Sequence, residues 1–156
     1  GREAGDMSLH PRTSVLAVVG LTASLVALTG CSSVEALLSQ QESVTYATVA
    51  EAREGGLDAP WLPGDATDIR MVRSTAANAP DAVVLVDSAA GLDPAVCAEV
   101  DRQSAPSYSI DGAPDVYRAE TVYACGAWAV LVADGGWYGW TPSHPDEAAQ
   151  APARRD

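Results

Sequence analysis

The stretch "AWAVLVADGGWYGWT", residues 127–141, is the clearest structural signal in the chain. Two apolar runs flank a short Asp-Gly-Gly sequence, and a Gly-rich turn between two such runs is typical of a β-hairpin. We expect one strand over residues 127–133 and the returning strand over residues 137–141. Successive side chains of a strand point to opposite faces, so Trp128 and the two valines that follow it should share the core face.

The same hairpin carries much of the aromatic content of the chain, which has four Trp, five Tyr and no Phe. On the returning strand, Trp137 faces one way, whereas Tyr138 and Trp140 face the other. We expect Tyr138 and Trp140 to be exposed, because they lie near the end of the sheet. Together with Trp61 and Trp137 they form a candidate binding surface for a protein or a glycan. The alternative is that all four Trp are packing residues.

Upstream segments predict further strands and short helices. One expected strand begins at Asp68 and includes Ile69 and Val72, and two more cover residues 82–88 and 115–126. The expected helices are residues 44–54 and a short helix that begins at Asp93. This order predicts an α+β fold, a small antiparallel sheet of four to five strands with two or more short helices on one face. We expect a single domain over residues 45–141. Residues 142–156 hold no core residue larger than Ala, and we expect this tail to be disordered.

An apolar segment near the start of the chain predicts export. Residues 15–28 carry no charge, and their length of fourteen suits the core of a signal peptide. A membrane-spanning helix needs about 20 residues. The segment ends in Leu-Thr-Gly-Cys at residues 28–31, which resembles the lipobox of bacterial lipoproteins. In that family the Cys receives a diacylglyceryl group and the preceding peptide is removed. The alternative is an uncleaved anchor helix with a Cys there by chance.

The resemblance implies a specific organisation and location. Residues 1–30 would be a signal peptide, with the true start at Met7, and residues 31–44 would be the lipidated Cys with a tether or helix. Two acyl chains anchor a protein firmly, so Cys31 would hold it on the extracytoplasmic face of the cell membrane. The sequence "WLPGDATDI", residues 61–69, is also similar to a segment of small exported bacterial proteins of uncharacterised function, and this likeness implies no activity.

Charge and cysteine content narrow the possible partners. The chain has 21 acidic and nine basic residues, a net charge of −12, so we expect no nucleic-acid partner. It has three Cys. If Cys31 is acylated, Cys97 and Cys125 remain as the candidates for a disulfide in an oxidising compartment. A redox pair is the less favoured alternative, because catalytic dithiols are usually close together in sequence.

Few residues of the chain suit catalysis. After residue 30 there is one His, His144, within the expected tail, and there is no Lys. A nucleophile–base pair, a zinc site and a phosphate loop therefore lack their usual residues, and we expect no cofactor and no metal. Asp65 and Asp68, with Asp58 nearby, could chelate Ca²⁺, although a solvated turn explains them as well. We expect a non-enzymatic binding or scaffolding domain; the alternative is a small envelope hydrolase that uses acidic residues.

Overall fold

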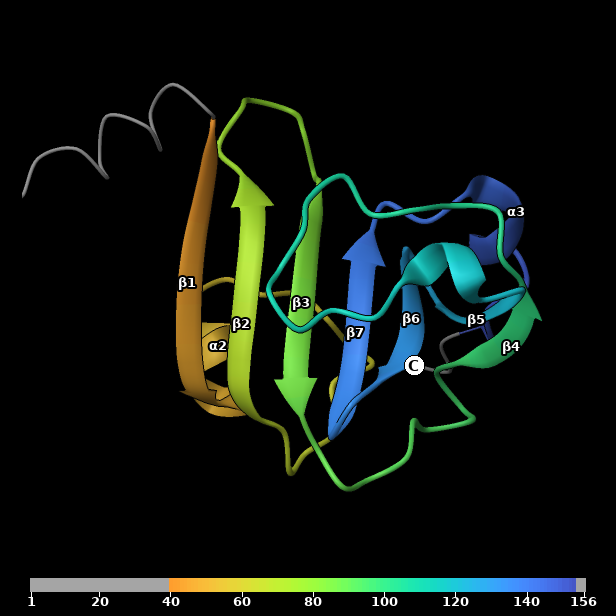
Figure 1. The fold of residues 1–156 in the computed structure, drawn as a ribbon, viewed down its shortest axis with the longest axis horizontal. Helices are drawn as coiled ribbons and strands as arrows, with labels where there is room; N and C mark the ends of the chain where they lie inside the picture. Colours follow the sequence, from red (N-terminus) through yellow and green to blue (C-terminus); the bar gives the residue numbers. More distant parts are fainter. Residues whose placement is uncertain (1–39, 154–156) are drawn as a thin grey trace, which may run out of the picture.

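The computed structural model describes residues 40–153, which form one seven-stranded antiparallel sheet (Figure 1). The strands are β1 (Gln41–Thr48), β2 (Thr67–Ser74), β3 (Ala82–Asp87), β4 (Ala98–Asp101), β5 (Thr121–Cys125), β6 (Trp128–Ala133) and β7 (Gly136–Thr141). The helical elements are short: α2 (Val49–Glu54), α3 (Pro145–Ala148) and the 3₁₀ turn η1 (Val116–Arg118).

The strand order is β1-β2-β3-β7-β6-β5-β4. β1 to β3 follow one another across the sheet, and β4 to β7 do the same from the opposite end. The two series meet in the middle, where β3 pairs with β7 from Ala82↔Thr141 to Asp87↔Gly136. The sheet therefore joins two meanders through one central ladder.

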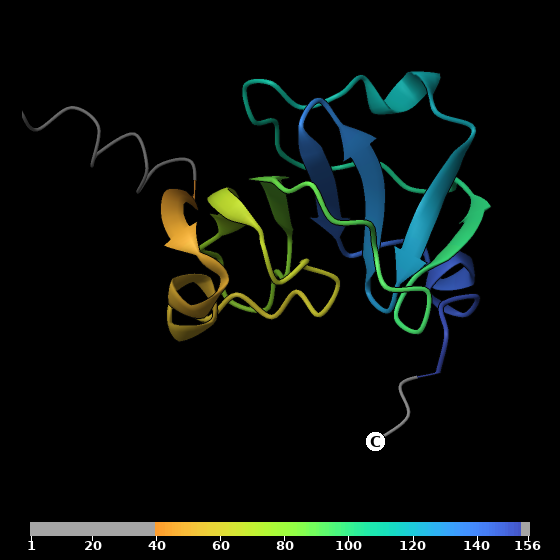
Figure 2. The ribbon, with the colours of Figure 1, turned by 90° about the horizontal axis from the view of Figure 1, so that it is seen from below.

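Both faces of the sheet are covered. We call the face toward the viewer in Figure 1 the front face; residues 102–120, here the covering segment, cross it. α2 and residues 55–66 lie on the opposite, back face, as the second view makes clear (Figure 2). Each face has its own apolar cluster, one around Trp61 and one around Trp140. Most of this cover is irregular chain rather than helix.

The central strand β3 shows how the two clusters share the sheet. Residues 82–86 are all buried, as the run of β-branched residues predicts. Val84 and Val86 belong to the back cluster, whereas Val83 and Leu85 belong to the front cluster. Alternate side chains of β3 therefore point into two different apolar clusters, and neither face of the strand points to solvent.

The predicted fold class is wrong in the number of strands and in the weight given to helices. Seven strands are present where four to five were expected, and helical turns are a minor addition. The first part of the expected helix at residues 44–54, residues 44–48, is the end of β1, and the helix itself is limited to α2, residues 49–54. The β-branched residues at the end of β1 favour a strand, and pairing with β2 stabilises that conformation. The short helix expected from Asp93 is also wrong, because residues 94–96 form a turn and residues 98–101 are strand β4.

The expected disorder of residues 142–156 is also wrong for the part that the structure describes, which runs to residue 153. α3 begins with a capping box formed by His144 and Glu147. The Glu147 side chain is fully buried and accepts hydrogen bonds from the backbone of Gln103 and from both the backbone and the hydroxyl of Ser104. These hydrogen bonds to the covering segment hold residues 142–153 in place. A lack of large apolar residues therefore does not predict disorder here.

Candidate functional site

The aromatic residues proposed as a binding surface are mostly core residues. Tyr138 and Trp140 are each 1% exposed, and Trp61 is 2% exposed. The Trp140 Nε1 donates to Ser104 Oγ at 2.9 Å, and burial raises the pKa of Tyr138 to about 12. The prediction that Tyr138 and Trp140 are exposed is therefore wrong. The covering segment buries Tyr138 and Trp140. Because this segment has no regular periodicity in the sequence, its position could not be predicted.

Trp137 is the one member of that set that stays partly accessible. Its ring lies edge-to-face with Tyr123 at 5.8 Å between centroids, and its Nε1 donates to the carbonyl of Ala90 at 2.9 Å. Trp61 instead packs under the sheet, where a Cβ on Gly139 would come within 2.5 Å of its ring. These contacts make the hairpin a packing element on both faces.

Cys97 and Cys125 form a disulfide, as the cysteine count predicts. Their sulfur atoms are 2.09 Å apart and their Cα atoms 4.3 Å apart. The bond joins the turn before β4 to the end of β5, so it fastens one end of the sheet. Cys31, the predicted lipidation site, lies outside the described residues.

The aspartates weighed as calcium ligands have separate partners. Asp65 accepts hydrogen bonds from the Ser88 hydroxyl at 2.5 Å and from the N–H groups of Ala89 and Ala90, and these bonds hold its pKa below the usual value. Asp68 lies 3.1 Å from the Nε of Arg70. Within residues 40–153, no three His, Cys, Asp or Glu side chains are grouped closely enough to hold a metal ion. Asp65 thus organises the loop after β3.

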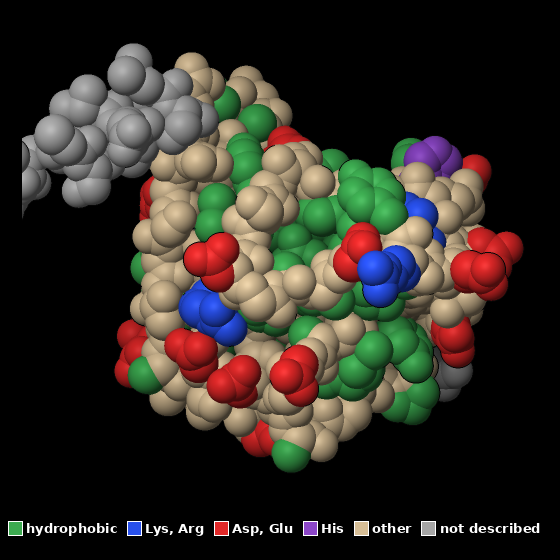
Figure 3. All heavy atoms as spheres, in the orientation of Figure 1, with side chains coloured by type: hydrophobic (Ala, Val, Ile, Leu, Met, Phe, Trp, Pro, Cys, Tyr) green, Lys and Arg blue, Asp and Glu red, His purple; other side chains and the backbone are tan. Residues whose placement is uncertain are grey.

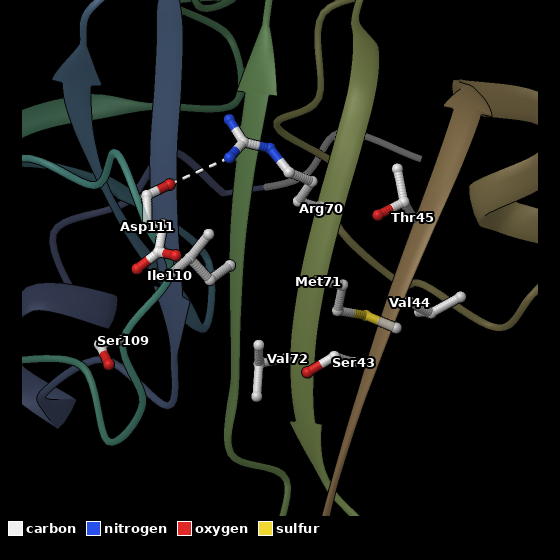
Figure 4. Close-up of a pocket in the computed structure, with 9 residues that line it drawn as sticks. All are labelled: Ser43, Val44, Thr45, Arg70, Met71, Val72, Ser109, Ile110 and Asp111. Atoms are coloured by element: carbon white, nitrogen blue, oxygen red, sulfur yellow. Dashed lines mark hydrogen bonds between the residues drawn. The ribbon is translucent and has the colours of Figure 1, made fainter. Parts of the chain in front are cut away.

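A groove of about 420 Å³ lies on the front face, between β1 and β2 on one side and the covering segment on the other (Figure 4). Its lining combines hydroxyls, apolar groups and one guanidinium: Ser43, Val44, Thr45, Arg70, Met71, Val72, Ser109, Ile110 and Asp111. The space-filling view of this face shows apolar side chains within the hollow and acidic side chains on the surface around it (Figure 3). The groove therefore offers mixed polar and apolar contacts.

Arg70 is the charged centre of this groove. Its Nη1 donates to the carbonyl of Asp111 at 3.0 Å, and its Nε lies 3.1 Å from Asp68 Oδ2. The first bond ties the covering segment to β2 and defines the groove's upper wall. One partner of the guanidinium is a backbone carbonyl, so the group keeps the capacity to bind an additional acceptor.

The groove is open because the covering segment stops at β2 and β3. Val72 and Ile110 each pack against the front cluster, whereas Ser43 and Thr45 on β1 remain exposed. The sequence signal for this asymmetry is the alternation in "SVTY", residues 43–46, which was assigned to a helix and therefore missed. β1 thus presents a polar row on the front face and Val44 and Tyr46 on the back face.

Comparisons with known proteins add no family. No family model matches the chain, and no characterised protein and no solved structure matches it significantly. In the part that the structure describes, no helix has the length and apolar character needed to cross a membrane.

Proposed function

We propose that this chain is a bacterial envelope lipoprotein, anchored through Cys31 on the extracytoplasmic face of the cell membrane. The supporting observation is the disulfide between Cys97 and Cys125. Structural disulfides are typical of exported proteins. Pairing these two leaves Cys31 as the odd cysteine, at the end of an apolar segment and within a lipobox-like sequence. Export and lipidation explain both observations together.

The anchored domain works by binding, and its binding site is the groove beside β1. Open backbone, hydroxyls and a single Arg suit an extended partner that offers hydrogen-bond acceptors, such as a protein segment or a glycan of the envelope. Hydrolysis by acidic residues needs two carboxylates that face each other across a cleft. Asp111 is the one carboxylate that lines the described groove, which favours binding.

Lipidation is tested by feeding labelled fatty acid to cells that produce the full chain. The wild type should carry the label, and Cys31→Ser should not, because a hydroxyl does not replace the thiol in this acylation. The matched control is the double variant Cys97→Ser/Cys125→Ser, which should keep the label in whatever protein survives. Label on the Cys31 variant, or none on the wild type, would reject the anchor.

A further inference from the structure

The two end strands of the sheet differ in how they are protected. β4 has four residues and carries Glu99 and Asp101, and a short, charged edge discourages the addition of another strand. β1 has eight residues and contains neither Pro nor Lys. Its one charged side chain, Glu42, is held by Arg73 of β2 at 2.8 Å. Among residues 40–153, no segment pairs with the outer side of β1. β1 is therefore an unprotected edge.

Hydrogen bonds next to the strand show which backbone groups of β1 face outward. The N–H of Thr75 donates to the carbonyl of Gln40 at 2.7 Å, so this pair is a hydrogen-bonded one. Such pairs alternate along an antiparallel ladder, which makes the even-numbered residues of β1 bond to β2. The N–H of Ser74 donates to Asp81 at 2.8 Å, which confirms that even residues of β2 face β3 and odd residues face β1. The odd-numbered residues of β1 therefore point their N–H and C=O groups away from the sheet.

One of these outward groups already has a partner. The N–H of Ala47 donates to Glu51 Oε2 of α2 at 2.9 Å. The acidic side chain therefore blocks the last outward position of the strand. The positions that remain open to a new strand are Gln41, Ser43 and Thr45, which are spaced as alternate residues of one edge.

We propose that a second copy of this chain pairs with β1, antiparallel, with Ser43 of one copy opposite Ser43 of the other. This register brings Gln41 of each copy opposite Thr45 of the other, so all three open positions are used and Ala47 is not needed. The two sheets become one continuous sheet. The inference names a partner for the proposed binding domain and rests on the proposed function for the anchoring that brings the copies together.

The chemistry of β1 matches itself in this register. Ser43 and Thr45 are exposed on the front face. In this register Ser43 faces Ser43, a hydroxyl pair that is favourable between neighbouring strands, and Thr45 faces the polar side chain of Gln41. On the back face, Glu42 lies opposite Val44 of the second copy, so no like charges oppose each other. The arrangement has two-fold symmetry and closes after two copies, and the edges left over are the short acidic β4 strands. Pairing with a second copy thus leaves no long, unprotected edge strand in the dimer.

Anchoring favours this occupant over a segment from another protein. Gln41 lies ten residues after Cys31. An extended chain of that length spans about 33 Å at about 3.3 Å per residue, so copies held in one membrane can reach each other. Confinement to a common surface raises the effective concentration of each copy for the other, as a tether does.

Cross-linking in cells tests the register directly. In the full chain, Ser43→Cys should place two thiols on Cα atoms about 5.5 Å apart, which suits a disulfide. Mild oxidation should convert most of this variant to a species of twice the mass. The control is Val132→Cys, because Val132 is 61% exposed but lies within the sheet and not at its edge. This control should give at least several-fold less dimer.

Charge variants provide an independent measurement. Ser43→Lys and Ser43→Glu should each abolish association of the detergent-solubilised full chain in sedimentation, since like charges then oppose each other. Mixing the two variants should restore a dimer, whereas Val132→Lys should associate as the wild type does.

The outcomes separate this inference from the anchor. A fatty-acid-labelled Ser43→Cys protein that forms no dimer, or that cross-links to a protein of another mass, overturns the pairing and leaves the anchor standing. If the wild type takes up no label, the anchor is rejected, and a dimer formed by Cys31→Ser/Ser43→Cys, whose one unpaired thiol is at position 43, still keeps the pairing.

Discussion

The two ends of the sheet are stabilised in different ways. At the β4 end, a disulfide joins Cys97 to Cys125, and the buried carboxylate of Glu147 holds the covering segment. At the β1 end, the long strand is held by its ladder with β2 and by packing on α2. The disulfide and the buried carboxylate thus occur where the strands are short. The end with the longer strand has surface ion pairs instead, and it keeps an edge available for a partner.

The largest expected effect lies between the two ends, in the front cluster around Trp140. Trp140→Ala should lower the free energy of unfolding by about 3–5 kcal/mol, because it removes a fully buried ring and leaves a cavity. Urea denaturation followed by fluorescence measures this loss. Val132→Ala, at an exposed position, is the control and should change stability by less than about 0.5 kcal/mol. A similarly small loss for Trp140→Ala would mean that its ring is on the surface.

Removing the disulfide should weaken the β4 end selectively. The double variant Cys97→Ala/Cys125→Ala should lose about 3–4 kcal/mol, the chain-entropy estimate for the sequence separation of 28 residues. Amide hydrogen exchange should accelerate more in β4 and β5 than in β1 and β2. Equal acceleration at both ends would show that the bond stabilises the sheet as a whole, and the contrast between the ends would then disappear.

Glu147→Gln should cost about 1–3 kcal/mol at neutral pH, because a buried charged acceptor is replaced by a neutral one. Burial alone raises the pKa of Glu147, but hydrogen bonds from Ser104, Gln103 and His144 outweigh it and hold the pKa below the usual carboxyl value. The folded-state pKa is therefore the lower one. Its stabilisation is complete above the unfolded-state value and is lost as the pH falls through the folded-state value.

Denaturation measured from pH 7 down to acid should thus show a smaller loss of stability for Glu147→Gln than for the wild type. Asp146→Asn, on the exposed side of the same turn, is the matched control and should follow the wild-type curve. If stability falls with pH equally in Glu147→Gln and the wild type, ionisation of Glu147 does not contribute to the loss of stability in acid.

The smallest effect is expected at the open edge. Thr45→Pro removes an N–H that points away from the sheet and should cost about 1 kcal/mol or less. Val44→Pro removes an N–H that bonds to β2 and should cost on the order of 2 kcal/mol more. Thermal unfolding of the two neighbouring variants compares them directly. Equal losses would contradict the assignment of outward groups on β1.

Local sequence signals predicted the middle of the sheet and missed its ends. The β-branched run of β3 and the Gly-containing turn between β6 and β7 carry their own pattern, and both were predicted. The end of β1 was predicted as helix, because Tyr46, Val49 and Ala50 have helical spacing, while its pairing partners in β2 lie 19 to 33 positions further along the chain, from Thr48↔Thr67 to Gln41↔Ser74. Pairing with a distant strand is a tertiary effect that local periodicity does not contain.

The candidate site was missed for a related reason. The predicted exposure of Tyr138 and Trp140 rests on their place near the end of the sheet, but the covering segment lies over them, and α3 holds that segment. The bonds that fix these two segments run from Glu147 to Ser104, residues 43 positions apart. No pattern in either segment indicates that contact. Cysteine counting did predict the disulfide, because it depends on number and compartment and not on local structure.

The position of β7 has a consequence for the order in which the protein is completed. The last strand of the chain lies in the middle of the sheet, between β3 and β6. As the chain leaves the ribosome, or crosses a membrane with its N-terminus first, β3 therefore lacks its inner neighbour until Thr141 has emerged. The N-terminal meander can form early, but until then the apolar residues 82–86 of β3 lack a partner on that side. Insertion of β7 between β3 and β6 therefore joins the two meanders late, and the sheet is continuous only after this step.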